Sequence, residues 1–365
     1  MTSDTTSERH VITVTGPVRA DSLGVTLPHE HLLLDLSTPY DTPSRQEASR
    51  FDFPTNEAQL VDWGEEFTAR RASWHRRRLF GGNRDMLRLD DVALAARELG
   101  DFAGHGGGTV VDVTSRGMGQ RPLDLVRLSE VTGVNIVLGT GYYRRAYHPE
   151  DMDEITTGEL EEIMTRDLQE GIDDTSVRAG LIGEIGAEHF DDEAETNEMR
   201  VMTAAARASA VTGAAISLHN HIGRPDLWHK GPDHLERAGA DLNRVIAGHI
   251  TGVDLDMVES LLARGMYVEF DTLGLPQLLE VPQVDNRPNI DLIIELVARG
   301  HVERILISHD VCTKAQLHEY GGNGYDYILT DVIPYFASRG LSSADVDTIV
   351  RHNPARVLAR ASTHG

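Results

Sequence analysis

Eight short apolar segments, spaced along the whole chain, constrain the fold more than any other feature. Each is a nearly continuous apolar run bounded by glycine, proline or polar residues, which is typical of parallel strands buried on both faces. The segments cover residues 25–35, 109–114, 135–141, 180–186, 215–221, 245–250, 267–272 and 304–310. They predict eight parallel strands.

Amphipathic stretches of helical period separate these segments and cover residues 89–102, 122–132, 193–212, 254–264, 290–299 and 329–339. Strictly alternating strands and helices predict an α/β fold, a distorted (β/α)8 TIM barrel. The competing doubly wound sheet needs a glycine-rich turn after its first strand, and the first strand runs into HEHLLLD instead. No proline-rich or serine-rich linker divides the chain, so residues 1–365 are expected to form one domain. Residues 38–88 are expected to be a helical insertion near the barrel mouth.

The charge balance excludes several classes of protein. The 34 basic residues against 58 acidic residues leave a net charge of −24, which argues against a nucleic-acid partner. No apolar run reaches the roughly 20 residues of a membrane span, and the N-terminus lacks a secretory signal. The single cysteine, Cys312, cannot form an internal disulfide, so a cytoplasmic protein is expected.

Polar residues stand at the carboxyl ends of the expected strands, where a barrel collects its catalytic groups. His29 and His31 are two residues apart, so the period of a strand points both imidazoles to the same side. The other strand-end candidates are Glu184, His219, His249 and Asp310. Burying so many titratable groups without compensation would be costly, and divalent metal would supply that compensation. Ligands of nitrogen and oxygen without thiolate fit Zn²⁺, and also Mn²⁺, Co²⁺ or Fe²⁺.

Longer motifs surround these residues: TLPHEHLLLD, GEIG, IAGHI, SHDVCTKAQLHEYGGNGYDYIL and HNPARVL. In these motifs the chain resembles the phosphotriesterase-related family of the amidohydrolase superfamily, over residues 15–358. The resemblance implies a binuclear metal hydrolase on a distorted barrel. It further implies that His29, His31 and Asp310 bind the more buried of two metal ions, and that His219 and His249 bind the more exposed one.

The bridging residue departs from the best-known phosphotriesterases, in which a carboxylated lysine on strand four joins the metals. The only lysines here, Lys230 and Lys314, lie in expected loops after strands five and eight. The resemblance therefore places Glu184 in the bridging role, as in the branch that contains the phosphotriesterase homology proteins. Assembly should then not need CO₂.

The metals would lower the pKa of a shared water, so that a bridging hydroxide attacks a carbonyl or phosphoryl centre. Asp310 is expected to act as the catalytic proton acceptor and donor. The resemblance favours cleavage of a carboxylic ester, a lactone first, with phosphotriesterase activity slow and incidental. An alternative is hydrolysis of an N-acyl amide that carries an acidic group. A second is a barrel that binds a ligand without catalysis, against which the complete ligand set argues.

Substrate contacts are expected from the loops after the strands. The features that stand out there are Tyr142, Tyr143, Arg144, Arg145, Glu188, His189 and Arg224. Tyr142 is predicted to contact the substrate and Tyr143 to pack. Arg224 is predicted either to bind an anionic group of a small-molecule substrate or to pair with Asp226 or Asp233 at the surface. His309 and Asp271 are candidates for supporting the ligands, and the family resemblance implies a homodimer.

Overall fold

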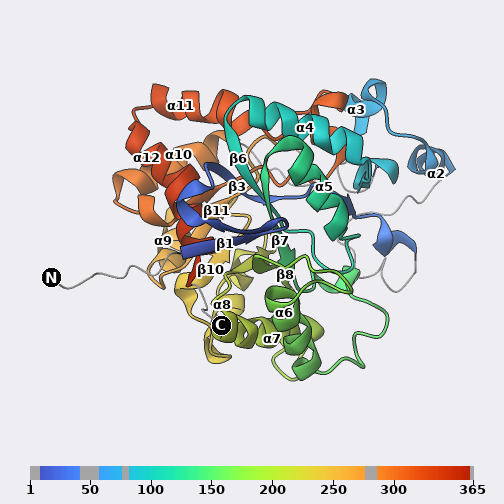
Figure 1. The fold of residues 1–365 in the computed structure, drawn as a ribbon, viewed down its shortest axis with the longest axis vertical. Coiled ribbons are helices and arrows are strands. Elements are labelled where there is room, and N and C mark those ends of the chain that lie inside the picture. Colours follow the sequence, from blue (N-terminus) through green and yellow to red (C-terminus); the bar gives the residue numbers. More distant parts are fainter. Residues whose placement is uncertain (1–8, 42–56, 76–81, 276–285, 362–365) are drawn as a thin grey trace.

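All eight expected strands are present and form one parallel sheet that is nearly closed into a barrel (Figure 1). The computed structural model describes residues 9–41, 57–75, 82–275 and 286–361. In sheet order the strands are β3 (Val25–Glu30), β6 (Gly107–Asp112), β7 (Asn135–Thr140), β8 (Leu181–Ala187), β9 (Ile216–Asn220), β10 (Val245–Ala247), β11 (Tyr267–Phe270) and β12 (Ile305–Ile307). The fold class predicted from the sequence is confirmed.

The seam of the barrel lies between the first and last strands of this sheet. Just beyond β12, the backbone N–H of Asp310 donates to the carbonyl of His29 at 3.2 Å, and that of His31 donates to the carbonyl of Val311 at 3.3 Å. The chain segment that carries two candidate ligands is therefore bonded directly to the segment that carries a third.

Helices surround the strands on the outside, with α4 and α11 on one side of the view and α6 and α7 on the other (Figure 1). The helices after the first barrel strands are α4 (Val92–Gly104), α5 (Pro122–Thr132), α6 (Thr157–Gln169), α7 (Asn197–Thr212) and α8 (Lys230–Arg237). Later in the chain come α9 (Leu255–Leu262), α10 (Asn286–Ala298), a π-helical turn (Ile328–Val332) that continues into α11 (Ile333–Ser338), α12 (Ser343–Asp347), a second π-helical turn (Thr348–His352) and α13 (Asn353–Leu358). Helices α6 and α8 are not among the stretches predicted from the sequence.

Local sequence explains where α6 and α7 begin and end. Thr156 and Glu159 form a capping box at the start of α6, and Thr196 caps the start of α7. Gly213 ends α7 in a left-handed conformation with φ of +70°, which glycine adopts without steric cost.

The insertion after the first strand is bracketed by a short antiparallel pair, β4 (Leu34–Asp35) and β5 (Arg88–Leu89). Between them lie α2 (Glu57–Gly64) and α3 (Ala69–His75), while residues 42–56 and 76–81 lie outside the described residues. Phe67, Ala72 and Met86 of this region pack against Leu275 and Ala315, which follow β11 and β12. The insertion therefore contacts loops at the carboxyl ends of the barrel strands.

A three-stranded sheet of β13 (Arg360–Ala361), β1 (Arg9–Thr13) and β2 (Gly16–Arg19) joins the two ends of the described chain. The side chain of Val11 on β1 is fully buried against Val137 and Leu181 in an apolar cluster with barrel strands. Among the described helices, none combines the length and apolar character needed to cross a membrane.

Candidate metal centre

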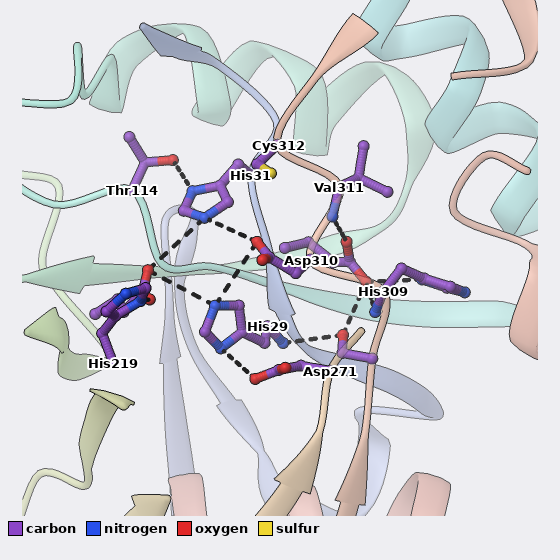
Figure 2. A network of polar contacts seen from close by, with 12 residues as sticks. His29, His31, Thr114, His219, Asp271, His309, Asp310, Val311 and Cys312 are labelled. Atoms are coloured by element: carbon purple, nitrogen blue, oxygen red, sulfur yellow. Dashed lines mark hydrogen bonds and ion pairs between the residues drawn. The ribbon is translucent and has the colours of Figure 1, made fainter. Parts of the chain in front are cut away.

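The six strand-end residues predicted as ligands come together at the carboxyl end of the barrel. His29 and His31 at the end of β3 both direct their rings inward, with ring centroids 6.0 Å apart (Figure 2). Glu184 lies within β8, His219 on β9 and His249 just after β10. All five side chains are buried, with exposed fractions between 0 and 4%. The strand alternation and strand-end positions that motivated the prediction are observed.

The first group of ligand atoms spans the barrel seam. The Nε2 atom of His31 lies 3.4 Å from Oδ1 of Asp310, and the Nε2 atom of His29 lies 4.0 Å from the same oxygen. One potential ligand atom from each of these three residues falls within 4.8 Å of the others. We call His29, His31 and Asp310 the seam-side group.

The second group lies on the neighbouring strands. The Nε2 atom of His249 is 2.7 Å from Nδ1 of His219 and 3.0 Å from Oε1 of Glu184, and His219 also contacts Glu184 through Nδ1. Their ligand atoms again all lie within 4.8 Å of one another. We call His219 and His249 the loop-side group, because Glu188, which lies 2.9 Å from His219, begins the loop after β8.

Glu184 faces both groups, with one carboxylate oxygen towards each. Its Oε2 atom lies 3.7 Å from Nε2 of His29 and 3.9 Å from Nε2 of His31, whereas its Oε1 atom faces His249 and His219. This is the placement that a carboxylate shared between two cations requires.

The seam-side group fits divalent metal better than hydrogen bonding. Ligand atoms of one tetrahedral ion with bonds of about 2.0–2.2 Å lie about 3.4 Å apart, which is the separation between His31 and Asp310. The Nε2 atom of His29 is buried and has no hydrogen-bond partner among the described residues. The oxygens of Glu184 and Asp310 nearest to it are 3.7 and 4.0 Å away, too far for a hydrogen bond.

The outward nitrogens of the rings are held mostly by carboxylates. Nδ1 of His29 lies 3.1 Å from Glu269 and 3.3 Å from Asp271, and Nδ1 of His249 lies 2.9 Å from Asp271. Because carboxylate oxygens accept these hydrogen bonds, the Nδ1 atoms carry protons and the Nε2 atoms face the site. Nδ1 of His31 is 2.8 Å from the hydroxyl of Thr114 (Figure 2). Asp271 thereby supports one histidine of each group.

Charges within the protein shift the pKa values of the site residues. Burial opposes protonation of His249, but the nearby Asp271 carboxylate prevails and raises its pKa to about 10. Burial also opposes protonation of His29, but the charge of Asp271 prevails again and raises the pKa of His29 well above its usual value. Burial would raise the pKa of Glu184, yet the charge of His219 lowers it well below the usual range, and His31 lowers the pKa of Asp310 in the same way. In the metal-free protein, protons on the histidines therefore supply the positive charge between the carboxylates.

Two of the candidate ligands have strained backbone. His249 and Asp310 adopt left-handed conformations with φ of +59° and +52°. Such conformations cost about 1 kcal/mol or more for residues other than glycine and recur at functional sites. This backbone conformation directs both side chains into the site immediately beyond their strands.

Glu30, between the two histidines of the motif, points to the opposite side and closes the seam. Its fully buried carboxylate accepts hydrogen bonds from the Ser308 hydroxyl at 2.8 Å and from the backbone N–H groups of His309 and Val311 at 2.9 and 2.8 Å. It also accepts from Nδ1 of His309 at 2.7 Å, while Nε2 of that ring accepts from the N–H of Ile328. Both ring nitrogens of His309 therefore form hydrogen bonds that hold the seam.

The predicted substrate contacts occupy different surroundings. Tyr142 is 5% exposed with its ring against His148, whereas the Tyr143 ring packs edge-on against His219 at 4.7 Å, with its hydroxyl 3.4 Å from Nε2. Arg224 forms a two-point ion pair with Asp226 at 2.7 and 2.8 Å, as in the surface alternative. Substrate contact by Tyr142 and Arg224 stays a prediction, and Tyr143 joins them as a candidate.

Sequence reasoning missed several supporting residues. Glu269 on β11 is a carboxylate within an apolar strand, which is the same signal that identified Glu184, and it could have been found. Asp112 on β6 accepts from the N–H groups of Leu32 and Thr114 and holds the start of two loops. Thr114 has no distinguishing sequence signal. The two lysines lie away from the ligands, since Lys314 pairs with Asp85 and Lys230 with Asp192.

Known proteins resemble this chain over nearly its whole length. The model of the phosphotriesterase family matches residues 9–358. An N-acetyltaurine hydrolase from Dictyostelium discoideum is 32% identical over 95% of this chain and 96% of its own length. The crystal structure of a resiniferatoxin-binding protein from Rhodobacter sphaeroides superimposes with a TM-score of 0.87 and 32% identity, covering 96% of this chain and 94% of that one. A mutant of a phosphotriesterase-like lactonase from Deinococcus radiodurans gives a TM-score of 0.71 and 26% identity, covering 95% and 99%.

Proposed function

The chain belongs to the phosphotriesterase family and is a hydrolase, and from this premise we propose that it cleaves the amide bond of small N-acyl compounds that carry an acidic group, with two divalent metal ions. The observation that carries the metal dependence is Glu184, whose two oxygens face two separate groups of ligand atoms. The observation that favours the amide is the relative named as an N-acetyltaurine hydrolase, similar over nearly the whole chain. N-acetyltaurine is an acetamide with a sulfonate, which is the chemistry of the amide alternative.

We assign His29, His31 and Asp310 to one ion, His219 and His249 to the other, and Glu184 to both. With Glu184 shared by both ions, the chain would belong to the branch of the family that has glutamate in place of the carboxylated lysine. Zn²⁺ fits the nitrogen and oxygen donors, as do Mn²⁺, Co²⁺ and Fe²⁺. When bound, the ions would supply an ionised water near neutral pH and polarise the substrate carbonyl.

The chain itself supplies the proton transfers. The side chain of Asp310 keeps 14% of its surface exposed, and His31 lowers its pKa, so the carboxylate is ionised at neutral pH. It is placed to accept the proton of the attacking water and to deliver it to the leaving nitrogen. An amide leaving group needs this proton more than an alkoxide does, because an amine anion is a very poor leaving group.

The acidic group of the substrate would meet a cation at the mouth. Arg224 follows β9, and its partner Asp226 is largely exposed, as is Arg224 itself. An exposed ion pair of this kind contributes little to stability, so a substrate sulfonate or carboxylate can replace Asp226 at low cost.

Lactone hydrolysis is the second candidate, favoured by the Deinococcus lactonase of the same fold at 26% identity. A lactone presents the same planar carbonyl to the site and has an easier leaving group. It gives Arg224 no anion to bind. The dependence of turnover on the acidic group therefore separates the two candidates.

The test is metal content of the purified protein together with turnover of a substrate panel. The panel contains N-acetyltaurine, N-acetyl amino acids, their neutral amide analogues, matched lactones and a paraoxon-like triester. We expect two ions per chain and the highest kcat/KM for the acidic amides. Turnover confined to lactones would overturn the amide assignment, and protein that cannot be loaded with metal would overturn the mechanism.

A further inference from the structure

We infer that Glu188 is a positioning residue for His219, held in place by Arg144 and Glu198, and that it sets the affinity of the loop-side group for its metal ion. Glu188 follows β8 in the loop that leads to α7. The inference rests on the proposed metal centre and adds to it three residues that carry no ligand atom.

The contact between Glu188 and His219 fixes which nitrogen of the ring faces the site. Oε1 of Glu188 lies 2.9 Å from Nε2 of His219. This contact turns Nε2 towards Glu188, so that Nδ1 of the same ring faces Glu184 and His249. A carboxylate in this position also makes the imidazole a stronger ligand.

Arg144 holds Glu188 in place. Its Nη1 atom lies 3.6 Å from Oε2 of Glu188, and the arginine side chain is 3% exposed. The rings of Tyr143 and Tyr147 each lie with their centroids 5.6 Å from the guanidinium carbon. A guanidinium buried among aromatic rings needs an anion beside it, and Glu188 is that anion. In agreement, the Glu188 carboxylate raises the pKa of Arg144 against the effect of burial.

Glu198 joins the two loops that carry this pair. It lies in the first turn of α7 and is 2% exposed. One of its oxygens accepts from the backbone N–H of Arg145 at 2.8 Å, and the other accepts from the N–H groups of Glu188 and His189, both at 2.8 Å. A single buried carboxylate thus sets the distance between the loop after β7 and the loop after β8.

The second glycine of the GEIG motif permits this arrangement. A Cβ atom on Gly186 would lie 2.6 Å from the Cα atom of Arg144, closer than real Cβ contacts allow. The backbone at Arg144 therefore packs directly on β8, and this brings the guanidinium within reach of Glu188.

His219 differs in this respect from the other histidines of the centre. The carboxylates behind His29 and His249, Glu269 and Asp271, stand on β11 or directly beyond it. The carboxylate behind His219, Glu188, also stands directly after its strand, β8, but it is held by an arginine from a second loop. A change at Glu188 should therefore alter one ion and spare the other.

The first experiment compares Glu188→Gln with the wild type by zinc titration against a chromophoric chelator. The amide keeps the shape of the side chain but removes the charge that orients His219. We expect the affinity for one of two ions to fall about 10- to 100-fold, with the other retained. The absorption spectrum of the Co²⁺-loaded protein should change in the band of that ion alone. Glu193→Gln is the matched control, because it removes a charge from an exposed position in the same loop.

A second variant separates positioning from a merely structural ion pair. Glu188→Gln combined with Arg144→Met removes both buried charges, so Tm should recover relative to Glu188→Gln alone. We expect the metal affinity to stay low in this double variant, since His219 still lacks its carboxylate. Recovery of affinity together with Tm would overturn the inference, as would an unchanged affinity in Glu188→Gln. Wild-type protein that binds fewer than two ions would instead overturn the metal centre itself.

Discussion

The two groups of ligands face each other across Glu184 but are held in different ways. In the seam-side group, His29 is backed by Glu269 on β11, and Asp310 is held by the seam, where Glu30 binds the backbone on both sides of it. In the loop-side group, His219 is backed by Glu188 and Tyr143, which come from two loops. Exposure does not distinguish the groups, since His31 and His219 are 3 and 4% exposed.

This difference indicates which part of the site is rigid and which part can vary between related proteins. A strand-end ligand is placed by the hydrogen-bond ladder of the barrel, so its support is shared with the fold. The position of a ligand that is supported by loop residues can change without a change in the barrel. The members of this family that differ in substrate would be expected to differ most around the equivalent of His219.

The largest effect should come from the residue that belongs to both groups. Glu184→Ala removes one ligand oxygen from each ion and leaves two groups of histidines without their shared anion. We expect loss of both metals and a decrease of kcat/KM of about 10³-fold or more. Metal analysis after gel filtration measures the first effect and steady-state kinetics the second. Retention of one tightly bound ion would show that the two groups are independent.

A large effect on folding should come from Glu30→Gln. The amide can no longer accept from all four donors that the carboxylate binds, and those donors are buried. We expect a loss of about 3 kcal/mol of unfolding free energy, measured by urea denaturation of the metal-free protein. The exposed Glu295→Gln should leave it nearly unchanged. Equal stability of the two variants would mean that the seam does not depend on Glu30.

The pH dependence tests what the two groups share. The pKa of His249 in the metal-free protein is raised to about 10, so its contribution to stability is complete below pH 6.5 and is lost as the pH rises through about 10. The Tm of chelated protein should therefore decrease between pH 7 and 10. Metal must displace this proton, so its affinity should increase over the same range. Calorimetry of chelated and loaded protein checks both, and identical pH profiles for the two forms would contradict the prediction.

The smallest effect should come from Arg224→Ala, in the loop after β9. If Arg224 binds the acidic group of the substrate, KM for an acidic amide should increase roughly tenfold while KM for a neutral lactone stays the same. Comparing both substrates on one variant controls for damage to the loop. Equal KM changes for both would leave Arg224 as the partner of Asp226 alone.

Much of the fold and the candidate ligand set could be predicted because both depend on local patterns. An apolar run identified each barrel strand, and a polar residue at its end identified His219 or Asp310 as a candidate without knowledge of its neighbours. The helix α6 was missed because its apolar stripe of Leu160, Met164 and Leu168 is narrow and its burial comes from packing on α7. Tyr142 and Tyr143 are adjacent in sequence, so only the path of the loop could show which ring lies against His219.

Residue types and their spacing along single strands were enough to predict the barrel class, the six candidate ligands and the lack of a lysine near the expected bridge. The three-dimensional structure was needed to show which nitrogen of each imidazole faces the site, how the oxygens of Glu184 divide between two groups, and that Glu188 and Arg144 stand behind His219. These depend on contacts between residues that are far apart in the chain. Such contacts form through space when the strands close into a barrel, and no periodicity in the sequence encodes them.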